Sequence, residues 1–126
     1  MASLFPFMSA DKIIDPETIE NLRMLDDDED GEDSFLREVI EIFLEDTPQK
    51  LTEMRDSFET GNTEVLSRAA HSVKGSSANV GAVKINSIAF DLENSTKDSV
   101  EGAGEKIAAL EAAFVEARAE LEKLLV

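Results

Sequence analysis

The chain has 126 residues, of which 28 are acidic and 12 are basic, and its formal net charge is −16. A charge of this size and sign argues against nucleic acid or an anionic membrane as a partner, because both are polyanions. The chain has no cysteine and a single histidine, which excludes a disulfide framework, a thiolate metal site and a multi-histidine zinc site. The length suits one domain with a single core.

The first segment, residues 1–14, is predicted to be an irregular arm, and residues 15–126 are predicted to form a single domain. The apolar start lacks the basic region of a signal peptide, and no apolar window is long enough to span a membrane. We therefore expect an intracellular protein, placed in the cytoplasm, with the nucleus as a further compartment.

A short first helix is predicted from the run Asp-Pro-Glu at 15–17. Aspartate caps a helix, proline suits its first position, and an acid is favourable in its first turn. Apolar residues follow with helical spacing at Ile19, Leu22 and Leu25.

An acidic run at 26–33 comes next, with seven acids in eight residues. Its aspartates at 26, 28 and 30 and its glycine at 31 match the first half of an EF-hand calcium loop. The twelfth position should be a bidentate glutamate but is Arg37, and the apolar eighth position is Asp33. We therefore interpret the run as a solvated acidic loop, with calcium binding or attraction of a basic partner as alternatives.

A long second helix is predicted from Asp33 or Ser34 to Gly61. Pro48 interrupts it, which predicts either a kink or two abutting helices with Thr47 capping the second. The apolar stripe is assigned to Phe35, Val39, Ile42, Phe43, Leu51, Met54 and Phe58.

The third helix is predicted from Asn62 or Thr63 to Gly81, with a capping side chain at its start and a glycine for a left-handed residue at its end. His71 lies about 140° from the centre of the apolar stripe and is therefore expected to point away from the core. The stripe consists of Leu66, Ala69, Ala70, Val73, Ser77 and Val80.

Two further helices are predicted, one from Gly81 to about Thr96 and one from about Glu105 to Leu125. Both keep an apolar face with helical spacing, and no segment alternates with a period of two. The predicted fold is therefore all-α: an up-down antiparallel four-helix bundle with a short additional N-terminal helix.

The surroundings of His71 suit a phosphoryl carrier. Gly75 lies one turn away on the same face, although glycine inside a helix costs about 1 kcal/mol relative to alanine. One interpretation is a fraying helix end, and the other is that a side chain at this position would block access to the imidazole. Lys74 could supply charge to phosphoryl oxygens, and an imidazole nitrogen is a nucleophile near neutral pH.

The run from His71 to Gly81, HSVKGSSANVG, resembles the signature of histidine-containing phosphotransfer domains. The single-domain type of fungal and plant multistep phosphorelays is the most similar. The resemblance implies a four-helix bundle in which His71 accepts a phosphoryl group from a receiver-domain aspartate of a hybrid sensor kinase. It then passes this group to a receiver-domain aspartate of a response regulator.

The resemblance also implies roles for other residues. Glu93 would contact the imidazole from the neighbouring helix, Lys74 would support the phosphoryl group, and Gly75 and Gly81 would keep access open. No intrinsic cofactor or metal is expected, since Mg²⁺ would come with the receiver domain. A monomer without autonomous kinase activity is expected. Receiver docking is assigned to Leu22, Leu25 and Phe35, for which burial in the core is the alternative.

Two other classes of function stay open at this point. The chain could be a non-catalytic helical adaptor in which His71 is incidental, or a calcium-responsive module that uses the acidic run. Glu93 and Lys74 could likewise be ordinary surface residues.

Overall fold

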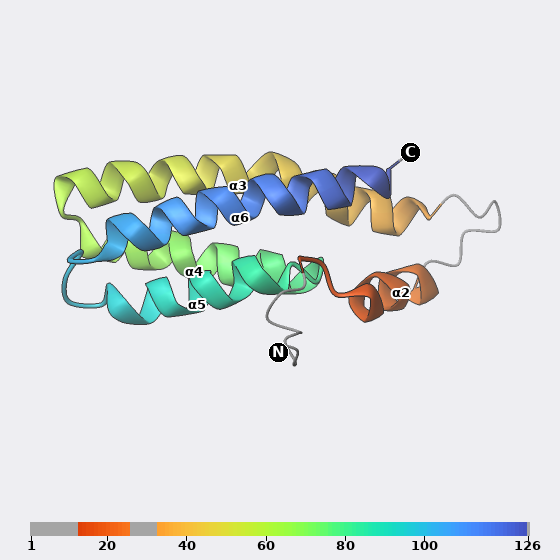
Figure 1. The fold of residues 1–126 in the computed structure, drawn as a ribbon, viewed down its shortest axis with the longest axis horizontal. Helices are drawn as coiled ribbons and strands as arrows, with labels where there is room; N and C mark the ends of the chain where they lie inside the picture. Colours follow the sequence, from red (N-terminus) through yellow and green to blue (C-terminus); the bar gives the residue numbers. More distant parts are fainter. Residues whose placement is uncertain (1–12, 26–32, 126) are drawn as a thin grey trace, which may run out of the picture.

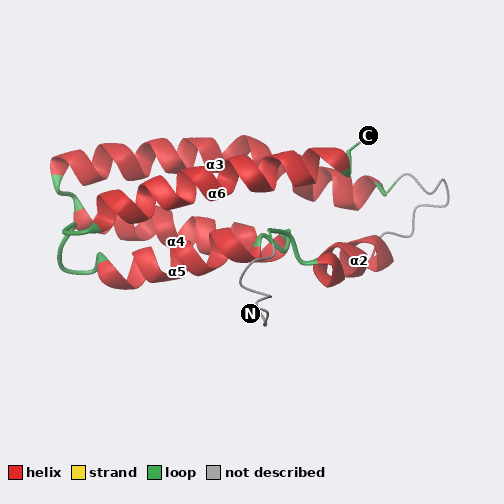
Figure 2. Cartoon of the chain, in the orientation of Figure 1, coloured by secondary structure: helices red, strands yellow, loops and turns green. Residues whose placement is uncertain are grey.

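A computed structural model describes residues 13–25 and 33–125, and all regular structure within them is helical (Figure 2). The predicted arm is therefore described only from residue 13, and the acidic run, apart from Asp33, lies outside the described residues, so the calcium-loop alternative is not tested. The helices are α2 (Pro16–Leu25), α3 (Ser34–Thr60), α4 (Thr63–Asn79), α5 (Val83–Ser95) and α6 (Ala103–Lys123).

Helices α3 to α6 run side by side along one long axis and are joined by short connections (Figure 1). Helix α4 packs against α3 and α5, and α6 packs against the same two neighbours. Helix α2 lies at one end of the bundle and packs on α3. The predicted four-helix bundle with an additional N-terminal helix is confirmed.

Local signals set the ends of α4. The Asn62 side chain accepts a hydrogen bond of 3.1 Å from the backbone N–H of Val65, which caps the helix as predicted. At the other end Gly81 has φ 72°, a left-handed conformation that favours glycine. The predicted buried stripe of α4 is confirmed, since all six of its residues, Leu66, Ala69, Ala70, Val73, Ser77 and Val80, are buried.

Helix α3 continues through Pro48 as one helix, so the alternative of two abutting helices is wrong. Thr47 accordingly caps nothing and is buried in the helix interior. The predicted stripe was also wrong in the first half of the helix, where Phe35 and Ile42 are exposed. The buried residues are Leu36, Ile40, Phe43, Thr47, Leu51, Met54 and Ser57. These residues recur every three or four positions without a break. The face that is buried after Pro48 therefore also sets which face is buried before it.

The Thr47 hydroxyl is buried without a hydrogen-bond partner among the described residues. A buried hydroxyl without a partner loses its hydration and gains nothing in return. We expect Thr47→Val, which keeps the shape of the side chain, to raise the free energy of unfolding by about 1 kcal/mol. Urea unfolding measures this as a higher midpoint with an unchanged slope. A lower midpoint would show that the hydroxyl has a partner.

Gly81 also joins the start of α2 to the turn between α4 and α5. Its carbonyl accepts a hydrogen bond of 2.8 Å from the backbone N–H of Asp15. A Cβ atom on Gly81 would lie 2.8 Å from Cβ of Thr18, which is too close for a real contact. The structure thus gives this buried glycine a role in the turn and in the packing of α2, while its role in access to His71 stays a prediction.

Candidate functional site

His71 lies at the middle of α4 on the face that points away from the core. Its side chain is 65% exposed, which confirms the orientation expected from the helical periodicity. The side chains of Ala69 and Ala70, which precede it in sequence, are buried. They hold this part of α4 against the core, while the imidazole stays outside.

A carboxylate from the neighbouring helix holds the inner nitrogen of this imidazole. Oε2 of Glu93, on α5, lies 2.8 Å from Nδ1 of His71. Glu93 is well covered, with a side chain 17% exposed, and the hydroxyl of Ser67 on α4 donates to its backbone carbonyl at 3.4 Å. The sequence prediction that Glu93 meets the imidazole agrees with this geometry.

Lys74 joins the same carboxylate from the next turn of α4. Its Nζ lies 2.8 Å from Oε1 of Glu93, and this oxygen is buried, so the ammonium is its principal counter-charge. The backbone carbonyl of Lys74 accepts two hydrogen bonds. Nδ2 of Asn86 donates to it at 2.7 Å, and the Ser77 hydroxyl donates to it at 3.0 Å. His71, Lys74 and Glu93 therefore form one hydrogen-bonded and charged cluster.

The electrostatics of this cluster determine which imidazole nitrogen carries the proton. The Lys74 ammonium chiefly, and the His71 ring to a smaller extent, hold the pKa of Glu93 below its usual value, against the opposing effect of burial. Glu93 is thus ionised near neutral pH and can only accept hydrogen bonds. The proton of a neutral His71 must then sit on Nδ1, which leaves the lone pair of Nε2 facing outward as a nucleophile.

The pairing of Glu93 predicts a pH-dependent contribution to stability. Because its folded-state pKa is lowered, this contribution is fully present above the unfolded-state pKa, near 4.5, and is lost as the pH falls through the folded-state value. We expect Glu93→Gln to lower the free energy of unfolding by about 1–2 kcal/mol at pH 7, and by progressively less below pH 4.5. Urea unfolding between pH 3 and pH 7 measures the difference from wild type.

The matched control for this prediction is Glu116→Gln, which removes an exposed carboxylate that lies 3.0 Å from Nζ of Lys84. A surface pair of this kind is worth about 1 kcal/mol at most. A wild-type advantage over Glu93→Gln that stays constant from pH 7 to pH 3 would contradict the assignment.

Gly75 borders the imidazole from one turn along α4. Apart from its chain neighbours and the backbone of its own helix, a Cβ atom placed on it would meet nothing in the described part of the chain within 4 Å. The fold therefore does not require a glycine there, and yet a helix-interior glycine lowers stability. This supports the interpretation that Gly75 leaves room for something outside the chain.

A family model described as the Hpt domain matches residues 38–124. The chain belongs to the Hpt domain family. The resemblance found in the sequence is thereby confirmed, while the likeness to the fungal single-domain type stays a prediction. The comparison with curated proteins gives no match.

Solved structures of similar proteins have the fold of this Hpt domain. Histidine-containing phosphotransfer protein B from Pseudomonas aeruginosa PAO1 has a TM-score of 0.81 at 23% identity, covering 91% of this chain and 96% of its own. A rice protein described as a histidine-containing phosphotransfer protein has a TM-score of 0.78 at 27% identity, covering 90% and 79%. The Hpt domain of a hybrid histidine kinase from Shewanella has a TM-score of 0.72 at 13% identity, covering 90% and 93%.

The Hpt domain places the three predicted docking residues at the end of the bundle that carries α2. Leu22 is partly buried against the core, whereas Leu25 is 73% and Phe35 is 42% exposed. Sequence reasoning missed Ile42, which it assigned to the core. Ile42 is 56% exposed and, with Ser76 of α4, lines a hollow between α3 and α4. The continuous phase of the α3 stripe would have identified it.

Basic side chains flank a second hollow beside the imidazole of the Hpt domain. Arg68 of α4 and Lys97, which follows α5, line it together with His71 and Glu93. Sequence reasoning did not name Lys97 as part of the site, nor Phe90 of α5, whose ring lies under Nζ of Lys74. Within residues 13–25 and 33–125, no group of three or more metal-ligating side chains is arranged to hold an ion, and no described helix is long and apolar enough to cross a membrane.

Proposed function

We propose that this chain is a phosphoryl carrier of a multistep phosphorelay. His71 accepts a phosphoryl group from a receiver-domain aspartate of a hybrid sensor kinase and gives it to a receiver-domain aspartate of a response regulator. The observation that carries the proposal is the 2.8 Å contact of Nδ1 of His71 with Glu93, which places the proton of the neutral imidazole on Nδ1 and leaves the Nε2 lone pair free on an exposed side chain. Membership of the Hpt domain family supports it.

The transfer step follows from this tautomer. The Nε2 lone pair attacks phosphorus in line with the aspartyl oxygen, the N–P bond forms, and the P–O bond breaks with its electron pair returning to the receiver carboxylate. The proton stays on Nδ1, so the ring becomes a phosphorylated imidazolium that donates to Glu93. The carboxylate therefore stabilises the charge that develops on the ring, and donation to the second aspartate is the reverse of the same step.

Lys74 supplies the charge for the phosphoryl oxygens. Its ammonium lies 2.8 Å from Oε1 of Glu93. Lys74 is on the same face of α4 as His71, one turn away. When the phosphoryl group arrives, a second negatively charged group enters the cluster beside Glu93, and the ammonium can shift toward it. Mg²⁺ is proposed to belong to the receiver domain, and this chain adds no kinase activity of its own.

The receiver is proposed to dock over the exposed face of α4 and the neighbouring face of α3. Ile42 lies there beside Ser76 of α4, adjacent to Gly75. An exposed apolar side chain next to the acceptor helix suits a partner whose apolar surface surrounds its own phosphorylated residue. Leu25 and Phe35 extend the proposed surface, and the carrier is proposed to act as a monomer.

A direct transfer assay tests the carrier function. The protein is mixed with Mg²⁺ and a receiver domain that carries labelled phosphate. Label should move to the protein in a linkage that acid cleaves and alkali does not, which distinguishes phosphohistidine from a phosphoserine or an acyl phosphate. Absence of label with several receivers would contradict the carrier function and favour the non-catalytic helical adaptor.

A further inference from the structure

We infer that Phe90 positions the Lys74 ammonium for phosphoryl transfer. This inference rests on the proposed function, since it concerns the lysine that would meet the phosphoryl group. The carrying observation is that Nζ of Lys74 lies over the Phe90 ring, 5.6 Å from the ring centroid. This distance is within the range of a cation–π interaction.

Phe90 is not held at this place by the core. It lies on α5, and 54% of its surface is exposed, whereas Ala89 and Leu92 on the same helix are buried. An aromatic ring left this exposed gains little from burial, so the core does not fix its orientation and a contact at the surface can. The Lys74 ammonium is the charged group that the structure puts over its face.

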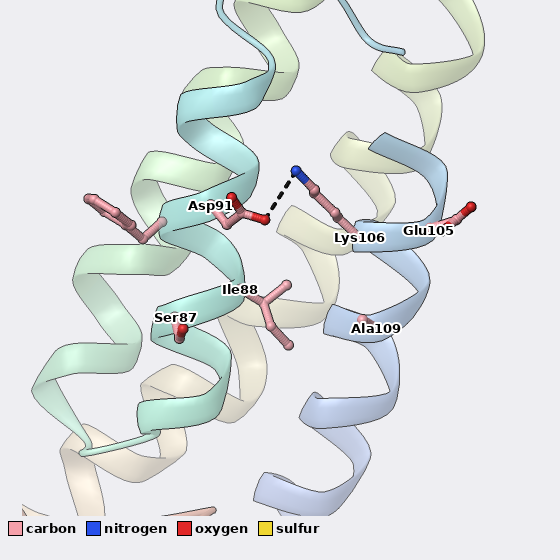
Figure 3. A pocket seen from close by; sticks show the side chains of 7 residues that line it. Ser87, Ile88, Asp91, Glu105, Lys106 and Ala109 are labelled. Carbon is pink, nitrogen blue, oxygen red and sulfur yellow. Dashed lines mark ion pairs between the residues drawn. The ribbon is translucent and has the colours of Figure 1, made fainter. Parts of the chain in front are cut away.

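The opposite flank of α5 packs against α6, and the charged group that it contacts there is not Lys74. Figure 3 shows Asp91 directed at Lys106 of α6, and their charged atoms lie 3.0 Å apart. Ile88 faces Ala109 of α6 across the pocket between the helices. Phe90 also borders this pocket, but its ring meets Nζ of Lys74 as well. The same ammonium pairs with Glu93, one helical turn further along α5.

The two contacts act differently on the ammonium. Glu93 neutralises the charge of Lys74 and must share it when a phosphoryl group arrives. The ring attracts the ammonium through its quadrupole without carrying a formal charge, so it restrains the long, flexible side chain and leaves its charge available. Phe90 thus keeps the ammonium close to His71 while the ammonium turns from the carboxylate to the phosphoryl oxygens.

Single-turnover transfer from a labelled receiver tests this inference on the full chain. Phe90→Leu removes the ring face and keeps apolar bulk, and we expect it to slow transfer about three- to fivefold. Phe90→Trp keeps an aromatic face and should restore the wild-type rate. In a Lys74→Gln background the effect of Phe90→Leu should vanish. The control is Val115→Ala, which removes exposed apolar surface from α6 and should leave the rate unchanged.

A spectroscopic measurement tests the contact without any phosphoryl donor. The Cε protons of Lys74 should be shifted upfield by the ring in the wild type and should return to their ordinary position in Phe90→Leu. An unchanged shift would overturn this inference and leave the carrier function standing. So would a rate loss that persists in the Lys74→Gln background, which is the result expected if Phe90 only contacts the receiver. A wild type that takes no label overturns the carrier function, and the positioning role with it.

Discussion

His71→Gln is expected to abolish phosphoryl acceptance, with a loss of at least about a thousandfold. Glutamine can still offer a polar side chain to Glu93, but an amide nitrogen has no available lone pair and cannot attack phosphorus. The chain contains no other histidine to take over the reaction. The measurement is the label on the protein after mixing with a phosphorylated receiver and Mg²⁺, compared with the wild type.

The fold should tolerate this change, which makes the result interpretable. The His71 side chain is 65% exposed, and exchanges at such positions usually change stability by less than about 0.5 kcal/mol. Arg118→Gln, an exposed exchange to the same residue on α6, serves as the matched control and should accept label normally. Label on His71→Gln at the wild-type level would show that another residue is the acceptor.

Gly75→Gln is expected to make the protein more stable and less active at once. Replacing a glycine in an exposed helix interior by a good helix former should raise the free energy of unfolding by about 0.5–1 kcal/mol. No steric clash offsets this gain, since a Cβ atom on Gly75 would contact no other part of the described structure within 4 Å. The new side chain would, however, project beside the imidazole, where a receiver must bring its phosphoryl group into line. We expect transfer to slow by tenfold or more, which corresponds to about 1.4 kcal/mol in the barrier.

Urea unfolding and the transfer assay on the same preparation check both halves of this prediction. Gly75→Ala should show a similar stability gain with a smaller loss of rate, because its side chain ends at the Cβ atom. Ala112→Gln, on the exposed face of α6, controls for adding the same side chain elsewhere. If Gly75→Gln transferred as fast as the wild type, the glycine would only destabilise the helix and would not be needed for the receiver to reach His71.

The sequence was sufficient where one face of a helix reads cleanly. In α4 the small and apolar residues mark a single stripe, and this alone put His71 outside the core. In α3 two apolar stripes lie next to each other, and Ile42 and Phe43 are adjacent in sequence, so composition could not choose between them. The choice is made by packing against α4 and α6, which extends the phase of Leu51 and Met54 through Pro48.

The site was predictable as far as a local motif reaches. His71, Lys74 and Gly75 lie within little more than one turn of one helix, and the resemblance to Hpt domains supplied Glu93. Phe90 carries no signal of its own in the sequence, because an aromatic residue on an amphipathic helix is ordinarily part of the core. Its place over Lys74 depends on the rotation of α5 against α4, which the sequence of neither helix specifies alone.

The position of His71 along the bundle has a kinetic consequence. It lies at the midpoint of α4, so a partner must approach the flank of an elongated molecule whose longest helix, with 27 residues, spans about 40 Å. In the proposed relay, one flank and one histidine would serve both the donor and the acceptor receiver, which could not bind at the same time. Turnover would therefore be ping-pong, because the phosphorylated carrier would leave its first partner before it meets the second. A receiver that cannot be phosphorylated would compete for the flank, so the relative abundance of the receivers would set the flux.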